Sequence, residues 1–425
     1  MKSNLLILLC IIFTQAFGQT LPKENYDRIK KSDSLYYDII KKADSLFIAS
    51  PGFALKQRYN FSETILSELS KDTTKDRKYQ RAAKMLSFIN DYKNTLAVWD
   101  SGVDKANKLR PGDSLSFLQF KPKNAKDFIV ERARKEQIII LNEAHHQPCH
   151  RVFTETLLAD LYKEGYRYFG AETLGYSDTS LNQRKHPVLW SGYYTWQPQY
   201  GNLVRTALQE GFYVFRYEGD GNGREREIDQ AKNIKAILDT NPQAKIIIHC
   251  GYGHLSEGEH PTLGKLLAGR LKEFTGIDPF TISQTDWTER SSPEYENPLF
   301  RIINLDYYAV FVDSSGNLFN GIPHHNQYDI RVYHPRSKWI DGRPHWVFEN
   351  GRQSFFVNKQ ITVSYPCLVF AYHAEENYPS AVAADIIELK NKDDTVALSL
   401  RRGEYNIVIK DAKGNEQIVK VKTNP

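Results

Sequence analysis

The sequence lacks the features that mark several classes of protein. It has 4 cysteines in 425 residues, and its 56 basic side chains nearly balance 51 acidic ones. So few cysteines exclude a small domain built on disulfides. Because the charges are balanced and form no basic block, we expect no nucleic-acid partner. Beyond the N-terminus, no apolar run approaches the roughly 18 residues that a membrane-spanning helix needs, so we expect no transmembrane span.

The N-terminus predicts export. Residues 1–20, "MKSNLLILLCIIFTQAFGQT", contain one lysine, an apolar stretch from Leu5 to Phe13 and then small residues. This pattern is typical of a secretory signal peptide over 1–18, cleaved after Gly18, so we expect a periplasmic or extracellular protein. Cys10 lies inside the apolar run rather than after it, which favours this interpretation over a lipoprotein. Cleavage leaves an odd number of cysteines, hence at least one free thiol: Cys149, Cys250 and Cys367.

The pattern of apolar residues changes twice along the chain. Residues 19–115 have helical spacing and carry no obvious chemistry, which indicates a helical packing region. Over 116–335, short helices alternate with nearly continuous apolar strands such as "QIIIL" and "AKIIIHCG", typical of parallel strands covered on both faces. Residues 345–425 alternate strictly and predict a sandwich-like β-domain. The predicted class is α/β, with a mostly parallel sheet flanked by helices, an N-terminal helical region and a C-terminal antiparallel β-domain.

Polar side chains follow four of the predicted buried strands. In open parallel sheets, ligands collect at these carboxyl ends. The groups are, in chain order, Glu143, His145, His146, Cys149 and His150; then Glu172; then Glu218 and Asp220; then His249, Cys250 and His254. Two arginines, Arg224 and Arg226, open the helix that follows "GDGNG".

A carboxylate held against an imidazole fixes its tautomer and raises its basicity, which suits a general base. We therefore predict that Glu143 holds His146 as the catalytic base, and that Glu172 and His254 complete the catalytic group. His249 ends its strand and is better explained as a hydrogen-bonded core histidine. The residues predicted to bind substrate are His145, His150, Glu218, Asp220 and Arg224, the arginine through an anionic group.

Each of these residues also has a purely structural interpretation. Glu143 and its histidine could form a structural hydrogen bond, and His150 could lie on a helix surface. Glu172 could stabilise the start of the next segment by its charge. The arginines could lie on a solvated helix face.

The cysteines leave three alternatives open. Cys149 with His150, and Cys250 with His254, could bind Zn²⁺, although the spacing matches no tight zinc motif. The metal ligands that the first loop could supply are His145, Cys149 and His150. A Cys149–Cys250 disulfide is the second alternative, and a nucleophilic Cys149 is the third.

Several motifs together resemble a known family. The order "NEAHH", "AET", "GDGNGREREIDQAKNI" and "KIIIHCGYGHLSE" is similar to that of the erythromycin-esterase-like and ChaN-like superfamily, over roughly 125–290. By position, Glu143 and His146 match the Glu and His of the family's first loop, Glu172 the second-strand Glu and His254 the late His. The chain departs from the family at Asn142, where a Gly is usual, and in the extra His145 and Cys149.

The resemblance implies a hydrolase in which a Glu–His pair activates water to cleave an ester, lactone or related acyl bond. It also implies alternatives: a non-catalytic protein that binds haem or metal, as in the ChaN-like branch, or a metal-dependent peptidase, as in the TraB/TIKI-like branch. Haem or a divalent metal would be the cofactor of these alternatives, while the esterase reading requires none. The expected partner is a small-molecule or peptide substrate.

Overall fold

Parallel strands form the centre of the protein, as the sequence predicts. The structure, a computed structural model, describes residues 75–321, 327–357, 361–378, 380–411 and 413–423. The predicted signal peptide and the first part of the helical region lie outside these residues. In spatial order the central sheet contains β1 (Lys121–Asn124), β9 (Ala309–Val312), β10 (Ile330–Tyr333), β8 (Phe280–Trp287), β2 (Ile138–Glu143), β5 (Ile246–Gly251), β3 (Tyr168–Ala171) and β4 (Tyr213–Phe215).

The register of this sheet brings the carboxyl ends of β2, β5 and β3 together. Strands β10, β8, β2, β5, β3 and β4 run parallel to one another, whereas β9 is antiparallel to both β1 and β10. Glu143 on β2 pairs with Gly251 on β5, and His249 on β5 pairs with Ala171 on β3. Polar residues that are distant in sequence therefore meet at one edge of the sheet.

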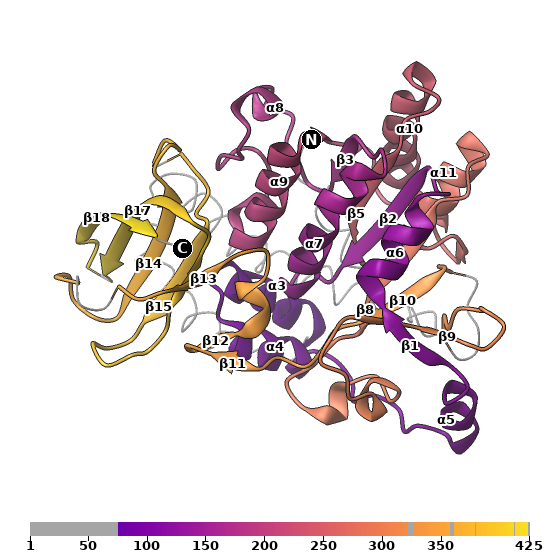
Figure 1. Ribbon diagram of the computed structural model, residues 1–425, viewed down its shortest axis with the longest axis horizontal. Helices are drawn as coiled ribbons and strands as arrows, with labels where there is room; N and C mark the ends of the chain where they lie inside the picture. Colours follow the sequence, from indigo (N-terminus) through magenta and orange to yellow (C-terminus); the bar gives the residue numbers. More distant parts are fainter. Residues whose placement is uncertain (1–74, 322–326, 358–360, 379, 412, 424–425) are drawn as a thin grey trace.

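Helices cover both faces of the sheet (Figure 1). Odd-numbered residues of β2 and β5, such as Ile139 and Ile247, face α6 (Ala125–Ala133), α7 (Cys149–Lys163) and α9 (Pro198–Glu210). Even-numbered residues of these two strands face α10 (Arg224–Thr240) and α11 (Leu267–Thr275). Because both faces are buried, the strands are nearly continuous apolar runs rather than alternating ones. A further short helix, α8 (Leu181–Arg184), lies between β3 and α9 in the sequence.

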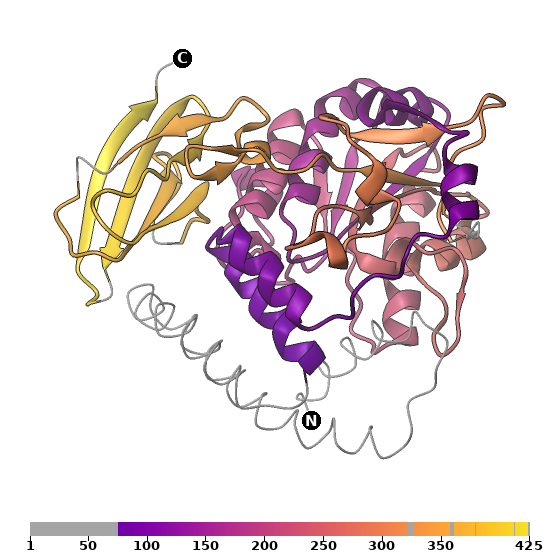
Figure 2. The ribbon, with the colours of Figure 1, turned by 90° about the horizontal axis from the view of Figure 1, so that it is seen from below.

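The described part of the N-terminal region is helical. It contains α3 (Lys75–Phe88), α4 (Tyr92–Ser101) and α5 (Pro111–Phe117). Figure 2 shows α3 and α4, in indigo, lying between the β-domain and the central sheet. Asn90 between these helices donates to Asp385 of the β-domain, and Trp99 of α4 stacks on His146. The pair of helices therefore contacts both the β-domain and the loop after β2.

The C-terminal region consists of antiparallel strands. A four-stranded sheet has the order β15 (Asp385–Leu389), β14 (Cys367–His373), β17 (Gly403–Asp411), β18 (Glu416–Thr423). The pair β13 (Gln353–Phe355) and β16 (Leu398–Leu400) shares an apolar core with one face of that sheet. The remaining short pairs are β6 (Glu259–His260) with β7 (Gly264–Lys265), and β11 (Trp339–Ile340) with β12 (Arg343–Pro344).

Buried ion pairs join this β-domain to the helices of the central sheet. Glu155 of α7 accepts hydrogen bonds from Arg352 at 2.7 Å and from Arg401 at 2.7 Å. Arg205 of α9 donates to Glu376 at 2.5 and 2.6 Å, and both side chains are buried. A buried charge that loses its partner is strongly destabilising, so these pairs hold the β-domain in one orientation. Within the described residues, no helix has the length and apolarity required to cross a membrane.

Candidate active site

Glu143, at the end of β2, is the centre of a buried hydrogen-bond network. Arg151 binds both of its carboxylate oxygens at 2.6 Å. His145 Nδ1 lies 2.8 Å from Oε1, and His249 Nε2 lies 2.9 Å from Oε2. Burial raises the pKa of Glu143, but Arg151 and the two histidines outweigh it and hold the pKa well below its usual value. Glu143 is therefore a fixed anion that orients its neighbours.

His145 is the histidine of the first loop that faces the other strand ends. Because ionised Glu143 can only accept, Nδ1 of His145 donates to it, and Nε2 keeps its lone pair. Its ring stacks on Tyr194 with a centroid distance of 4.3 Å. Burial lowers the pKa of His145, while Glu143 and Glu172 oppose that shift. A neutral, oriented imidazole with a free lone pair has the properties of a general base.

Gly251 allows His145 and Glu172 to approach each other. A Cβ added there would lie 2.4 Å from His145 Nε2 and 2.8 Å from Glu172 Oε2, so these two atoms are at most 5.2 Å apart. The Gly251 amide also donates a short hydrogen bond to Glu172 Oε2. A separation close to this limit lets one water molecule hydrogen-bond to both His145 Nε2 and Glu172 Oε2, each at about 2.8 Å.

A second cluster surrounds Arg226, near the start of α10. Its guanidinium donates to Glu172 Oε1 at 2.9 Å and to Glu218 at 2.7 and 3.0 Å. His254 Nε2 lies 2.9 Å from Arg226 Nη1, and its Nδ1 lies 3.0 Å from Glu227. Arg226 therefore joins the ends of three parallel strands, β3, β4 and β5, through one side chain.

The charge on His254 depends on whether its neighbouring carboxylates or Arg226 have the larger effect on the pKa of its ring. Burial lowers its pKa, but Glu227 and Glu172 raise it to about 10 against the opposing charge of Arg226. The 2.9 Å contact with Arg226 requires Nε2 to accept a hydrogen bond, which a protonated ring cannot do. Three carboxylates surround the two cationic side chains and favour the protonated ring, whose Nε2 proton faces Glu172 Oε1, 3.5 Å away.

The structure pairs Glu143 with His145 in place of the predicted His146. The His146 ring instead stacks on Trp99, with a centroid distance of 3.6 Å and an interplanar angle of 6°. Its Nδ1 lies 3.4 Å from the hydroxyl of Tyr252, and burial, followed by Arg290, lowers its pKa well below the usual value. Within the part of the chain that the structure describes, no hydrogen bond joins His146 to Glu143.

The remaining predicted residues are divided between the site and other places. Glu172, Glu218 and His254 belong to the Arg226 cluster described above. Asp220 and Arg224 are exposed, and the arginine that enters the cluster is Arg226. Arg224 lies on the exposed side of α10, as in the structural interpretation that placed the arginines on a solvated helix face. Arg226 does not, because the helical repeat turns positions 224 and 226 to different sides.

His150 and His249 are both buried. His150 accepts from the Ala144 amide at 3.0 Å, so its surface alternative is wrong. His249 is hydrogen-bonded inside the core, as the sequence favours, but its partner is Glu143.

The three described cysteines are free and buried. A Cys149–Cys250 disulfide is therefore wrong, and so is the joint zinc site of those two cysteines. Cys250 packs on the face of the sheet covered by α10 and α11, whereas Cys149 begins α7 on the opposite face. Burial raises the pKa of the Cys149 thiol, so it stays protonated and is a poor nucleophile.

Arg151 and Tyr252 are among the site residues that sequence reasoning missed. Arg151 belongs to α7 and looks like an ordinary helix residue, although it lies one residue after a His-rich loop. Tyr252 follows β5 directly, has φ +42°, and its ring meets His145 edge-on at 5.0 Å. The glycines on either side of Tyr252 in "GYG" were a signal that the backbone there is unusual, and a non-glycine residue with positive φ often marks a functional site.

Comparison with known proteins adds little to this description. No family model and no curated protein matches the sequence. Among solved structures, the chain is similar to one described as "The structure of the type III effector HopBA1", with 14% sequence identity and a TM-score of 0.31. The match covers 40% of this chain and 89% of that chain. A likeness this slight informs neither the fold nor the function.

Proposed function

We propose that the chain is a hydrolase that cleaves an ester, lactone or related acyl bond with an activated water. One observation carries this proposal: Glu143 holds His145 Nδ1 at 2.8 Å, while the other ring nitrogen faces Glu172 across Gly251. A base oriented by one carboxylate and facing a second carboxylate that can hold the attacking water is the minimum that such a hydrolysis needs. The resemblance of "NEAHH" and "GYGH" to motifs of the erythromycin-esterase-like superfamily supports the same proposal.

In this mechanism His145 Nε2 removes a proton from the water that it shares with Glu172. The resulting hydroxide attacks the acyl carbon, and the tetrahedral oxyanion forms beside the cationic side of the cluster. His254 protonates the leaving oxygen, because its neighbouring carboxylates keep a proton on its ring. Glu143 and Arg151 do not touch the substrate. Glu143, held in place by Arg151, fixes the tautomer and direction of the His145 ring. When the acid product leaves, His145 releases its proton to solvent and His254 takes one up from solvent, so both rings return to their starting states.

We further propose that the protein is exported, on the strength of residues 1–18. The rings of Tyr194 and Tyr252, which contact His145, suit a small-molecule or peptide substrate with an apolar portion.

The two adjacent histidines provide the test. With a substrate found by screening esters and lactones, His145→Ala should lower kcat by about 10²–10⁴-fold. His146→Ala should keep most of the activity, because that ring packs on Trp99. A large loss of activity in His146→Ala but not in His145→Ala would identify His146 as the base. Equal activity in the two variants would contradict the Glu–His mechanism.

A chelator and a haem titration separate the alternatives. Hydrolysis by the acyl mechanism should survive chelator, whereas a metal-dependent peptidase should lose its activity. A Soret band on adding haem, without turnover of any ester, would favour the haem-binding protein.

A further inference from the structure

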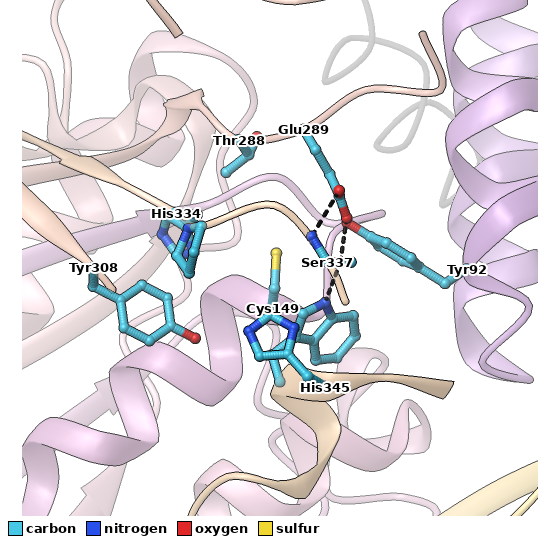
Figure 3. A pocket seen from close by; sticks show the side chains of 10 residues that line it. Tyr92, Cys149, Thr288, Glu289, Tyr308, His334, Ser337 and His345 are labelled. Atoms are coloured by element: carbon cyan, nitrogen blue, oxygen red, sulfur yellow. Dashed lines mark hydrogen bonds between the residues drawn. The ribbon is translucent and has the colours of Figure 1, made fainter. Parts of the chain in front are cut away.

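Three side chains with metal-binding atoms come together at the start of α7. The ligand atoms of Cys149, His150 and His334 all lie within 4.8 Å of one another. None is more than 4% exposed. Figure 3 shows the pocket beside them, where the Cys149 sulfur points toward the centre and His334 lies next to it. This group is separate from the Glu143 and Arg226 clusters.

The fold fixes each member from a different direction. Cys149 and His150 are the first two residues of α7, and His334 directly follows β10. The His334 amide donates to the Trp287 carbonyl at 2.9 Å, which continues the pairing of β10 with β8. Its ring packs edge-on against Tyr308, with a centroid distance of 5.1 Å. The side chains therefore have little freedom to turn away from one another.

Several of the buried nitrogens have no partner. Among the described residues, His334 Nδ1, His334 Nε2 and His150 Nε2 all lack a hydrogen bond. Buried polar atoms without partners are rare in proteins, and an ion or ligand at the site is one of the few explanations. By contrast, His345 on the wall of the same pocket has a hydrogen-bond partner, because its Nδ1 accepts from the Lys338 amide. Three unpartnered nitrogens therefore belong to the two histidines beside the Cys149 thiol.

We infer that Cys149, His334 and His150 form a binding site for Zn²⁺. Thiolate and imidazole are ligands that zinc prefers over the hard cations, whose ligands are oxygens. Ligand atoms around tetrahedral zinc are about 3.5 Å apart, so the present group would contract by about 1 Å. The pocket, lined also by Thr288 and Ser337, supplies the fourth side of the ion.

The protons balance as follows. Zinc binding expels the thiol proton of Cys149 to solvent, because a coordinating thiol is deprotonated by the metal. His334 needs no proton loss, since a neutral imidazole has one nitrogen free. His150 is different: its Nδ1 accepts from the Ala144 amide, so Nε2 carries the ring proton. His150 joins the ion when its ring turns from the Ala144 amide and frees the lone pair of Nδ1, so Cys149 and His334 are the two primary ligands.

Cobalt serves as the spectroscopic probe, since it substitutes for zinc and reports thiolate ligation. The full chain should bind one Co²⁺ with a near-ultraviolet thiolate-to-cobalt charge-transfer band, and Zn²⁺ should displace it. Cys149→Ser should abolish the band, and His334→Asn should weaken Co²⁺ binding at least tenfold. Cys367→Ser, which alters a buried cysteine of the β-domain, and His345→Asn, on the same pocket wall, should leave both unchanged.

A second measurement keeps the inference testable if a variant fails to fold. Zn²⁺, but not Mg²⁺, should raise the thermal unfolding midpoint of the wild-type chain in proportion to the logarithm of its concentration. No bound metal, a band that survives Cys149→Ser, or equal effects of Zn²⁺ and Mg²⁺ on unfolding would each overturn the site. The outcome does not depend on hydrolase activity, so it stands apart from the function proposed above.

Discussion

Replacing Gly251 with alanine tests the candidate active site directly. The added Cβ would lie 2.3 Å from His145 Cε1, 2.4 Å from His145 Nε2 and 2.8 Å from Glu172 Oε2. The backbone itself allows the change, because Gly251 has φ −87° and ψ 142°, which any residue adopts. The strain therefore falls on two side chains, His145 and Glu172, and the strand can stay in place.

The magnitude follows from the distances. Ordinary contact begins at about 3.4 Å, so the His145 ring must move by about 1 Å. A displacement of that size at a reacting group lowers the rate by about 10²-fold, or about 2.7 kcal/mol of transition-state stabilisation. Crowding a packed site destabilises the fold by about 1–3 kcal/mol. We thus expect kcat/KM to fall about 100-fold while the protein remains folded.

Gly253, two residues further along the same loop, is a matched control. A Cβ there would meet only Leu266 Cδ1, at 3.6 Å, which is ordinary contact. Steady-state kinetics on the screened substrate, together with thermal unfolding, should show Gly251→Ala folded and slow and Gly253→Ala nearly normal. If Gly251→Ala keeps its kcat/KM within a few fold, His145 and Glu172 are not the reacting pair, and the reasoning fails.

Two further predictions concern the contact with the β-domain. Glu155→Gln removes the charge that both Arg352 and Arg401 bind, so we expect the free energy of unfolding, measured in urea, to fall by about 3–5 kcal/mol. Glu404→Gln, in an exposed pair, is the control and should change nothing. Burial and neighbouring arginines lower the pKa of His373 to about 3. Because an unfolded histidine titrates near 6.5, the unfolded state gains the proton first as the pH falls. His373 should therefore contribute a loss of about 1.4 kcal/mol per pH unit between about pH 6 and pH 4, and none above pH 7. His373→Gln should remove that share of the slope, and an unchanged slope would contradict the assignment.

Much of the central sheet could be predicted because its strands are short apolar runs between amphipathic helices. "QIIIL" and "AKIIIHCG" became β2 and β5, and the helices between them lie where the spacing placed them. The edge strand β1 could not be predicted. β1, "KPKN", is exposed along its whole length and has no apolar pattern, so only its pairing with β9 makes it a strand.

The candidate site was predicted at the level of strand ends and missed at the level of single side chains. The order of strands along the chain placed Glu143, Glu172 and His254 at one edge. Neither the pairing of Glu143 with His145 nor the entry of Arg226 in place of Arg224 could be inferred. In a turn, the direction of each side chain depends on local hydrogen bonds such as that from the Ala144 amide to His150.

The sequence by itself determined the α/β class, the buried strands and the polar residues that end them, because these are written in local periodicity. The pleat of β2 even placed Glu143 on the face of Ile139 and Leu141. Only the tertiary structure decided which residues meet. His249 reaches Glu143 through the register of β2 with β5, and His334 reaches Cys149 because β10 lies beside β8. Both contacts join residues more than a hundred positions apart, and no local pattern encodes a pairing at that range.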